Sequence, residues 1–238
     1  MITGAAHRIG KVIAQTLHEL GVNIIIHYNT SEQKALQLCD ELNLIRAESA
    51  ITIQADLLVH DYAWLQTVLK RWDRLDILVN SASAFYTTSI GETTETQWDN
   101  LLGCNLKASF FLIQNTMHWL KESVGSVINI TDIHGNQPLK NYTAYCVSKA
   151  GLVMLTKSMA LELAPYVRVN GIAPGIALLP DDRRIYQDPK YQAYISNIPL
   201  QKVGTPADIA RTVVFLANEP YITGEIIHVD GGLGLGRR

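Results

Sequence analysis

Short, continuous apolar runs alternate along the chain with longer stretches of helical periodicity, and this alternation limits the fold more than any other feature. The run at 23–28 has no polar face, which is typical of a parallel strand buried on both sides. Similar runs lie at 51–55, 75–79, 125–130, 167–172 and 225–229. Helical stretches lie between them, at 11–20, 31–42, 61–71, 97–120, 143–163 and 206–217. This order predicts an α/β fold with one doubly wound parallel sheet flanked by helices.

Composition restricts the class of protein further. The chain has 238 residues, of which 47% are hydrophobic, enough for a single α/β domain over residues 1–238. The formal net charge is −2 and basic residues form no stripe, so we expect no nucleic acid partner. No segment reaches the ~18 apolar residues of a membrane helix, so we expect no membrane partner. The cysteines Cys39, Cys104 and Cys146 are scattered, which favours reduced thiols and a cytoplasmic protein.

The segment 3–10, Thr-Gly-Ala-Ala-His-Arg-Ile-Gly, leads directly into a helical stretch. Gly4 permits a tight turn and Gly10 permits close packing of the helix on the sheet, as in a Rossmann-type phosphate-binding turn. The helix N-terminus then offers free N–H groups and a positive dipole end to a pyrophosphate. Arg8 replaces the middle glycine of this pattern and adds a permanent cation. Because two spaced glycines are a weak signal, a plain loop with a surface arginine is the alternative.

Only Met1 and Ile2 precede this turn, although a dinucleotide-binding sheet has a strand there. Either the first strand is a stub, or it begins upstream of this numbering. Because a missing central strand would cost much of the sheet, we expect residues upstream of Met1.

The end of the 23–28 run bears on the choice of cofactor. Folds that bind NAD place Asp or Glu there to bind the adenosine ribose hydroxyls. This run instead ends in Tyr28, Asn29, Thr30 and Ser31, with no carboxylate. Neutral hydrogen-bonding groups tolerate a 2′-phosphate that a carboxylate would repel, so the sequence favours NADPH. Thr30 or Ser31 can equally cap the next helix, and the two roles are compatible.

Tyr145 and Lys149 are four residues apart in a helical stretch, which sets a phenol and an ammonium on one face, one turn apart. An ammonium near a phenol is expected to lower the tyrosine pKa and to make it a proton donor that partners hydride transfer. The apolar run at 125–130 is followed by Asp132, at the carboxyl end of a strand, where open α/β sheets bind ligands. A chance surface pair is the alternative for this spacing alone.

With these motifs in order, the chain resembles the short-chain dehydrogenase/reductase superfamily over nearly its whole length. The matching segments are Thr3–Gly4 with Ile9–Gly10, Asp56–Leu57, 80–83, Asn105, Tyr145 with Lys149, Pro174–Gly175 and 229–232. The resemblance implies that Asp56 and Leu57 contact the adenine, and that Asn105 bends a helix and holds a water near the lysine. The residues expected to bind the cofactor are Gly4, Arg8, Ile9, Tyr28, Asn29, Thr30, Ser31, Asp56, Leu57, Asn80, Ala82, Ser83, Tyr145, Lys149, Pro174, Gly175 and Ile176.

Two departures make the chain similar to pteridine reductase within that superfamily. Asp132 stands where most members carry serine, and Asn-Ser-Ala-Ser at 80–83 replaces Asn-Asn-Ala-Gly. Arg8 and the run at 136–139 fit the same subfamily. The resemblance implies a catalytic trio of Asp132, Tyr145 and Lys149 and a pterin stacked between the nicotinamide and Phe85. The residues expected to bind the substrate are Arg8, Ser83, Phe85, Asp132 and Tyr145.

Physical chemistry agrees with a pterin, because an aromatic face suits a flat heteroaromatic ring and a carboxylate accepts hydrogen bonds from its amino-pyrimidinone edge. Core packing is the alternative for Phe85, and a turn cap is the alternative for Asp132. A carbonyl reductase, such as a 3-oxoacyl-carrier-protein reductase, is the second hypothesis for function, although a carboxylate is unfavourable beside a developing alkoxide. A non-catalytic nucleotide-sensing protein on the same fold is the third, and the Tyr145–Lys149 pair weighs against it.

Residues 176–203 contain three prolines and four consecutive charges, which is typical of a substrate lid, with a solvated loop as the alternative. The helical stretch 143–163 is apolar well beyond one stripe, and Ala150 and Gly151 allow another helix to approach closely. The resemblance implies a homotetramer assembled through this region.

Overall fold

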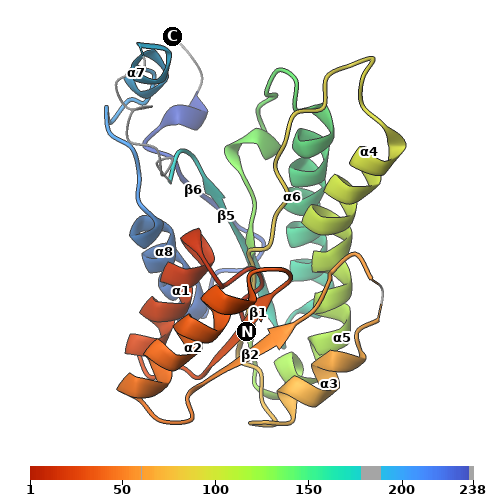
Figure 1. Ribbon diagram of the computed structural model, residues 1–238, viewed down its shortest axis with the longest axis vertical. Helices are drawn as coiled ribbons and strands as arrows, with labels where there is room; N and C mark the ends of the chain where they lie inside the picture. Colours follow the sequence, from red (N-terminus) through yellow and green to blue (C-terminus); the bar gives the residue numbers. More distant parts are fainter. Residues whose placement is uncertain (60, 178–188, 236–238) are drawn as a thin grey trace.

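The computed structural model describes residues 1–59, 61–177 and 189–235, and its core is a parallel β-sheet (Figure 1). One part pairs β1 (Ile24–Tyr28) with β2 (Ala50–Gln54). The other has the order β3 (Ile77–Asn80), β4 (Ser126–Ile130), β5 (Arg168–Pro174) and β6 (Ile226–Val229). Ile2 joins the two parts, because it forms isolated parallel bridges to Ile26 in β1 and to Val79 in β3. The predicted first strand is thus a single-residue bridge in the central position.

Helices cover both faces of this sheet (Figure 1). The first face carries α1 (Arg8–Glu19), α2 (Glu32–Ile45) and α8 (Pro206–Asn218). The second carries α3 (Ala63–Leu69), α4 (Glu95–Leu102), α5 (Ala108–Glu122) and α6 (Thr143–Leu163). The predicted α/β class, a Rossmann-type parallel sheet flanked by helices, is confirmed.

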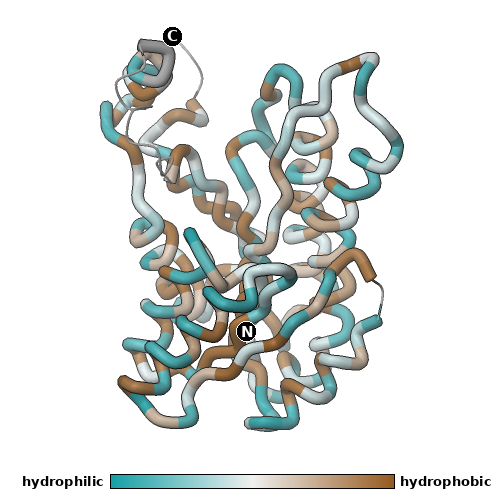
Figure 2. The backbone as a smooth tube through the Cα atoms, in the orientation of Figure 1, coloured by the Kyte–Doolittle hydropathy of each residue, from teal (hydrophilic) through white to brown (hydrophobic). Residues whose placement is uncertain are grey.

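Two hydrophobic cores form because successive strand residues face opposite sides of the sheet. In β4, Ile128 and Ile130 pack into the core under α1 and α8, whereas Val127 packs into the core under α5 and α6. The tube in Figure 2 is accordingly most hydrophobic along the central strands, and hydrophilic segments gather on the outer helices. Within the described part of the chain, no helix is both long and apolar enough to cross a membrane.

One predicted helix differs from the structure. The stretch 97–120 is divided into α4 and α5 by a π-helical turn, Gly103–Lys107. The apolar periodicity continues across this turn, so the sequence pattern alone did not show it. Of the predicted lid at 176–203, residues 178–188 lie outside the described part, and Pro189–Ser196 forms helix α7.

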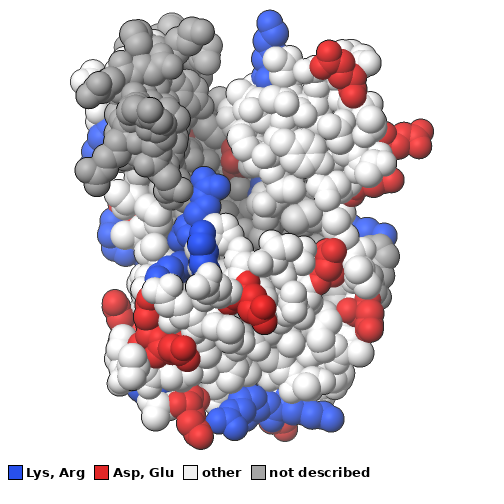
Figure 3. Space-filling model, viewed as in Figure 1, with Lys and Arg blue, Asp and Glu red and all other residues white. Residues whose placement is uncertain are grey.

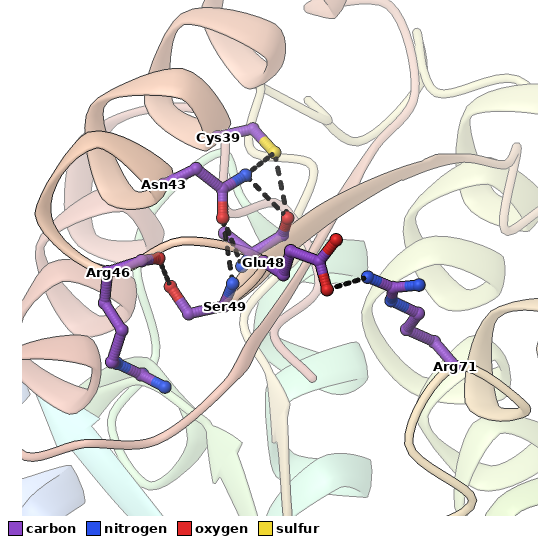
Figure 4. Close-up of polar contacts among 7 residues, drawn as sticks. Cys39, Asn43, Arg46, Glu48, Ser49 and Arg71 are labelled. Carbon is purple, nitrogen blue, oxygen red and sulfur yellow. Dashed lines mark hydrogen bonds and ion pairs between the residues drawn. The ribbon is translucent and has the colours of Figure 1, made fainter.

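A polar cluster fixes the link from α2 to β2 (Figure 4). The Asn43 side chain accepts hydrogen bonds from the backbone N–H groups of Ser49 and Ala50 and donates one to the Ala50 carbonyl, each 2.9 Å long. Glu48, with a left-handed φ of 55°, makes an ion pair of 3.1 Å with Arg71 beyond α3. The cluster therefore sets where β2 starts, and so where its carboxyl end reaches the cleft.

Candidate active site

A cleft of about 690 Å³ opens at the carboxyl ends of the strands, where open α/β sheets bind their ligands. Figure 3 shows the hollow, with basic side chains gathered beside it in that view. All the residues predicted to bind cofactor or substrate line it, except Asn80. Asn80 is buried at the end of β3, and its side-chain amide donates to Asn129 Oδ1 at 2.8 Å. Asn80 therefore differs from the other predicted residues, because its side chain bonds to β4 and does not line the cleft.

The glycine turn forms the floor where α1 begins. Gly4 has a φ of 64°, which favours glycine, and a Cβ on Gly10 would collide with the Gly4 carbonyl oxygen. Arg8 also has a positive φ, 55°, although it is not glycine, which is a cost that structures tolerate at functional sites. The conformation explains why glycine is usual at this position. It also presents an exposed guanidinium at the edge of the cleft.

Thr3 connects the glycine turn to the loop after β3. Its hydroxyl oxygen accepts hydrogen bonds from the backbone N–H groups of Ser81, at 2.9 Å, and Ala82, at 3.0 Å. Gly4 approaches the same loop so closely that a Cβ there would lie 3.0 Å from the Ala82 Cα. These contacts fix the spacing between two walls of the cleft.

Asn105 lies in the π-helical turn and holds the next part of this loop. Its Oδ1 accepts from the Ala84 N–H at 2.8 Å and from the Ser83 hydroxyl at 3.0 Å. Its Nδ2 donates to the Ala84 carbonyl and to Ser148 Oγ, both at 3.0 Å. The side-chain amide is thus occupied by protein groups on the loop and on α6. The Asn105 side chain is therefore a brace between Ser83–Ala84 and α6.

The predicted catalytic trio comes together at the end of β4. Asp132 is half-buried, and its Oδ2 accepts a hydrogen bond of 2.7 Å from the Tyr145 hydroxyl. Its Oδ1 accepts from the backbone N–H of His134 and caps a short 3-10 turn. Asp132 therefore caps a turn and also contacts the Tyr145 hydroxyl. Lys149 is only 2% exposed, and its Nζ donates to the Ile130 carbonyl at 3.0 Å.

The direction of the Tyr145 pKa corrects the sequence-based expectation. Burial, followed by the charge of Asp132 and the hydrogen bond to it, raises the tyrosine pKa well above its ordinary value. Lys149 does not reverse this, because its Nζ is bonded to Ile130 and lies 5.8 Å from the centre of the Tyr145 ring. Burial also lowers the pKa of Lys149, while the charge of Asp132 opposes that change. Tyr145 is therefore held as a protonated phenol at neutral pH.

Phe85 is not a core residue. Its side chain is 56% exposed and lines the cleft. The Tyr142 ring stacks on the Phe85 ring at a centroid distance of 4.6 Å, and the Tyr145 ring contacts the Phe85 ring edge to face at 4.7 Å. Phe85 is thus an exposed aromatic surface beside Tyr145.

The opposite wall comes from Pro174, Gly175 and Ile176, as the resemblance implies, followed by the buried Ala177. The sequence analysis did not single out several further lining residues, among them His7, His27, Cys104 and His134. A histidine within an otherwise apolar strand is the signal that marks His27. Within the described residues, no cluster of three or more His, Cys, Asp or Glu side chains could hold a metal ion.

Known proteins resemble the chain over nearly its whole length. A family model described as enoyl-(acyl carrier protein) reductase matches residues 4–234. The chain is 36% identical to pteridine reductase 1 of Leishmania tarentolae, over 100% of the chain and 96% of that protein. It is also 36% identical to a 3-oxoacyl-(acyl-carrier-protein) reductase of Staphylococcus epidermidis, over 98% of the chain and 97% of that protein. The corresponding protein of Aquifex aeolicus is 33% identical over 98% of the chain.

Proposed function

The chain belongs to the short-chain dehydrogenase/reductase family of nicotinamide-dependent oxidoreductases, and from this premise we propose that it is an NADPH-dependent pteridine reductase. The proposed reaction reduces a C=N bond of a dihydropterin to give the tetrahydropterin. Dihydrofolate and oxidised pterins are further candidate substrates. When bound, the reduced nicotinamide supplies the hydride, and Tyr145 supplies the proton to the ring nitrogen.

The hydrogen bond between Asp132 and Tyr145 carries this proposal. A carboxylate there can accept from the amino-pyrimidinone edge of a pterin, which carries N–H donors. The same negative charge would oppose an alkoxide that develops during ketone reduction. Because burial and then Asp132 raise the Tyr145 pKa, the phenol stays protonated until the ring nitrogen takes its proton. Asp132 is placed to relay the proton that replaces it.

Phe85 and Arg8 support a planar, polar substrate. Phe85 offers an exposed aromatic surface beside Tyr145, and stacking of this kind suits a heteroaromatic ring. Arg8 lines the same cleft, and its guanidinium can donate hydrogen bonds to a pyrophosphate and to the polar edge of a pterin. Ser83, which Asn105 holds in place, completes the proposed substrate contacts.

NADPH is proposed as the cofactor from the residues at the end of β1. No carboxylate stands among Tyr28, Asn29, Thr30 and Ser31, which all line the cleft. Partial burial, followed by the charges of Lys34 and Arg8, lowers the pKa of His7. The positive charges of Lys34 and Arg8, which act on His7, would favour a 2′-phosphate over a 2′-hydroxyl. The Glu32 carboxylate opposes this, since burial and then the charge of Glu32 raise the pKa of Tyr28.

Reduction of a 3-oxoacyl thioester is the second candidate function, since a relative of that name is equally identical to the chain. The two functions differ in what they require at position 132, because a carboxylate favours binding of a pterin and disfavours the alkoxide of ketone reduction. We expect Asp132→Ser to lower kcat/KM for dihydrobiopterin by about 100-fold or more, the scale of a lost acid–base partner. We expect kcat/KM for an acetoacetyl thioester to be unchanged or higher.

Asp40→Ser, on the exposed face of α2, is the matched control and should leave both substrates unaffected. Equal losses on both substrates, or a loss confined to the thioester, would contradict the proposed role of Asp132. A non-catalytic nucleotide sensor would show no turnover of either substrate in the unmodified protein.

We further propose a homotetramer, a cytoplasmic location and a substrate lid within 176–203. On α6, Val147, Met154 and Leu161 are spaced seven residues apart and are all exposed, at 42%, 61% and 82%. Such a stripe on one helix supports a subunit contact. All three cysteines are free, which supports a reducing compartment. Light scattering of the purified protein, with Leu161→Glu as the disrupting variant, tests the assembly.

A further inference from the structure

His27 uses both nitrogens of its ring inside the sheet. It lies in β1 and is 2% exposed. The backbone N–H of Gly4 donates to Nδ1 at 3.3 Å, and Nε2 lies 3.1 Å from the Ala55 carbonyl oxygen. A carbonyl oxygen only accepts, so Nε2 must carry the hydrogen, and Nδ1 must be the lone pair that accepts from Gly4. The surroundings therefore specify one neutral tautomer.

The two partners of this ring belong to different segments that border the same cleft. Gly4 begins the glycine turn, and Ala55 precedes Asp56 and Leu57, which are expected from the family resemblance to contact the adenine. The backbone of His27 adds two further links, because its N–H donates to the Ile2 carbonyl and its carbonyl accepts from the Ala5 N–H. One residue thus connects the glycine turn, β1 and the end of β2.

The ring has no freedom to turn away from these partners. Trp64 of α3 stacks on it, with a centroid distance of 5.7 Å and an interplanar angle of 30°. A buried side chain with two hydrogen bonds and a stacked face is held in a single orientation. The spacing between Gly4 and Ala55 is therefore set by the length of an imidazole.

We propose that His27 is a positioning residue of the nicotinamide-cofactor site, whose neutral ring holds the glycine turn at Gly4 and the segment 55–57 after β2 at a fixed separation. A dinucleotide spans both segments, so its affinity depends on that separation. Asp132 follows β4 and Tyr145 lies on α6, and among the described residues neither makes a hydrogen bond to this ring. The inference rests on the cofactor site of the family and holds for either proposed substrate.

Protonation would break the arrangement. A hydrogen on Nδ1 would face the N–H of Gly4, and two donors cannot share that bond. Burial lowers the pKa of His27 to about 4, although Asp56, the charged group that acts on it, opposes the change. Trp64, packed against the ring from α3, carries no charge. The neutral form is therefore maintained across the physiological range.

His27→Phe keeps a ring that can stack on Trp64 and removes both hydrogen bonds. We expect it to raise the Kd for NADPH, measured by isothermal titration calorimetry, by about tenfold or more, the scale of one to two lost hydrogen bonds. We expect kcat at saturating NADPH to change by less than about threefold. This split between binding and turnover separates positioning from a general loss of structure.

His18→Phe is the matched control, because His18 is equally buried at 2% but bonds to Ser49, on the link between α2 and β2. We expect it to lower the melting temperature and to leave the NADPH Kd within about twofold of the unmodified protein. If His27→Phe does not fold, His27→Gln, which keeps one donor and one acceptor, should fold with an intermediate Kd. An unchanged Kd in a folded His27 variant, or a Kd increase of the same size in His18→Phe, would overturn the proposal.

Discussion

Replacing Asn105 by alanine tests its role as a brace between Ser83–Ala84, in the loop after β3, and α6. The substitution removes four hydrogen bonds of 2.8–3.0 Å, made to Ser83, to Ser148 and to both backbone groups of Ala84. At about 1 kcal/mol net for each bond, with Asn105 and Ser148 buried, the expected loss of unfolding free energy is about 3–4 kcal/mol. For a domain of this size, that loss corresponds to a fall in melting temperature of about 10 °C.

The assay compares thermal and urea unfolding of Asn105→Ala with those of Asn115→Ala. Asn115 is exposed on α5 and makes one hydrogen bond, to the Phe111 carbonyl. We expect the control to lower the free energy of unfolding by less than about 1 kcal/mol. Equal losses of unfolding free energy in the two variants would refute the proposed bracing role of Asn105. The same Asn105 variant should also raise KM for the substrate, because Ser83 and Ala84 lose their support.

Three further predictions concern the cleft. Tyr145→Phe should lower kcat by about 100-fold to 10,000-fold and leave the NADPH Kd within a few-fold, and full turnover in steady-state assays would contradict the proton donor. Lys34→Glu should raise KM for NADPH far more than KM for NADH. Parallel changes in the two constants would show that Lys34 does not contribute to the preference for NADPH. Because His27 has a pKa of about 4 instead of 6.5, its contribution to stability is complete above pH 6.5 and is lost as the pH falls towards 4, by roughly 3 kcal/mol. Urea unfolding from pH 7.5 to 4.5 should therefore show a steeper loss in the unmodified protein than in His27→Phe, and equal slopes would refute that pKa.

The strands could be predicted from the sequence because burial on both faces leaves an uninterrupted apolar run. In β4, for example, Val127 and Ile128 serve different cores, and both must be apolar. The positions of Asp132 and Tyr145 also followed from local pattern, since one ends a strand and the other lies on a helix that returns to it.

Contacts between distant segments could not be predicted in the same way. The π-helical turn is invisible in the periodicity, since only the tertiary partners of Asn105 show what it supports. The expected fall in the Tyr145 pKa was wrong because spacing on a helix does not say which atom an ammonium contacts. Lys149 bonds to Ile130, and the group that touches the phenol is Asp132, thirteen residues away. His27 is visible as a polar residue in an apolar run, but the run does not show its two partners, which lie 23 and 28 residues away.

Turnover by the purified protein tests the central claim most directly. NADPH oxidation is followed with dihydrobiopterin, dihydrofolate and an acetoacetyl thioester offered in parallel at matched concentrations. The arrangement of Asp132, Tyr145 and Phe85 predicts the highest kcat/KM on dihydrobiopterin and a much lower value on the thioester. Turnover confined to the thioester would contradict the pteridine reductase assignment.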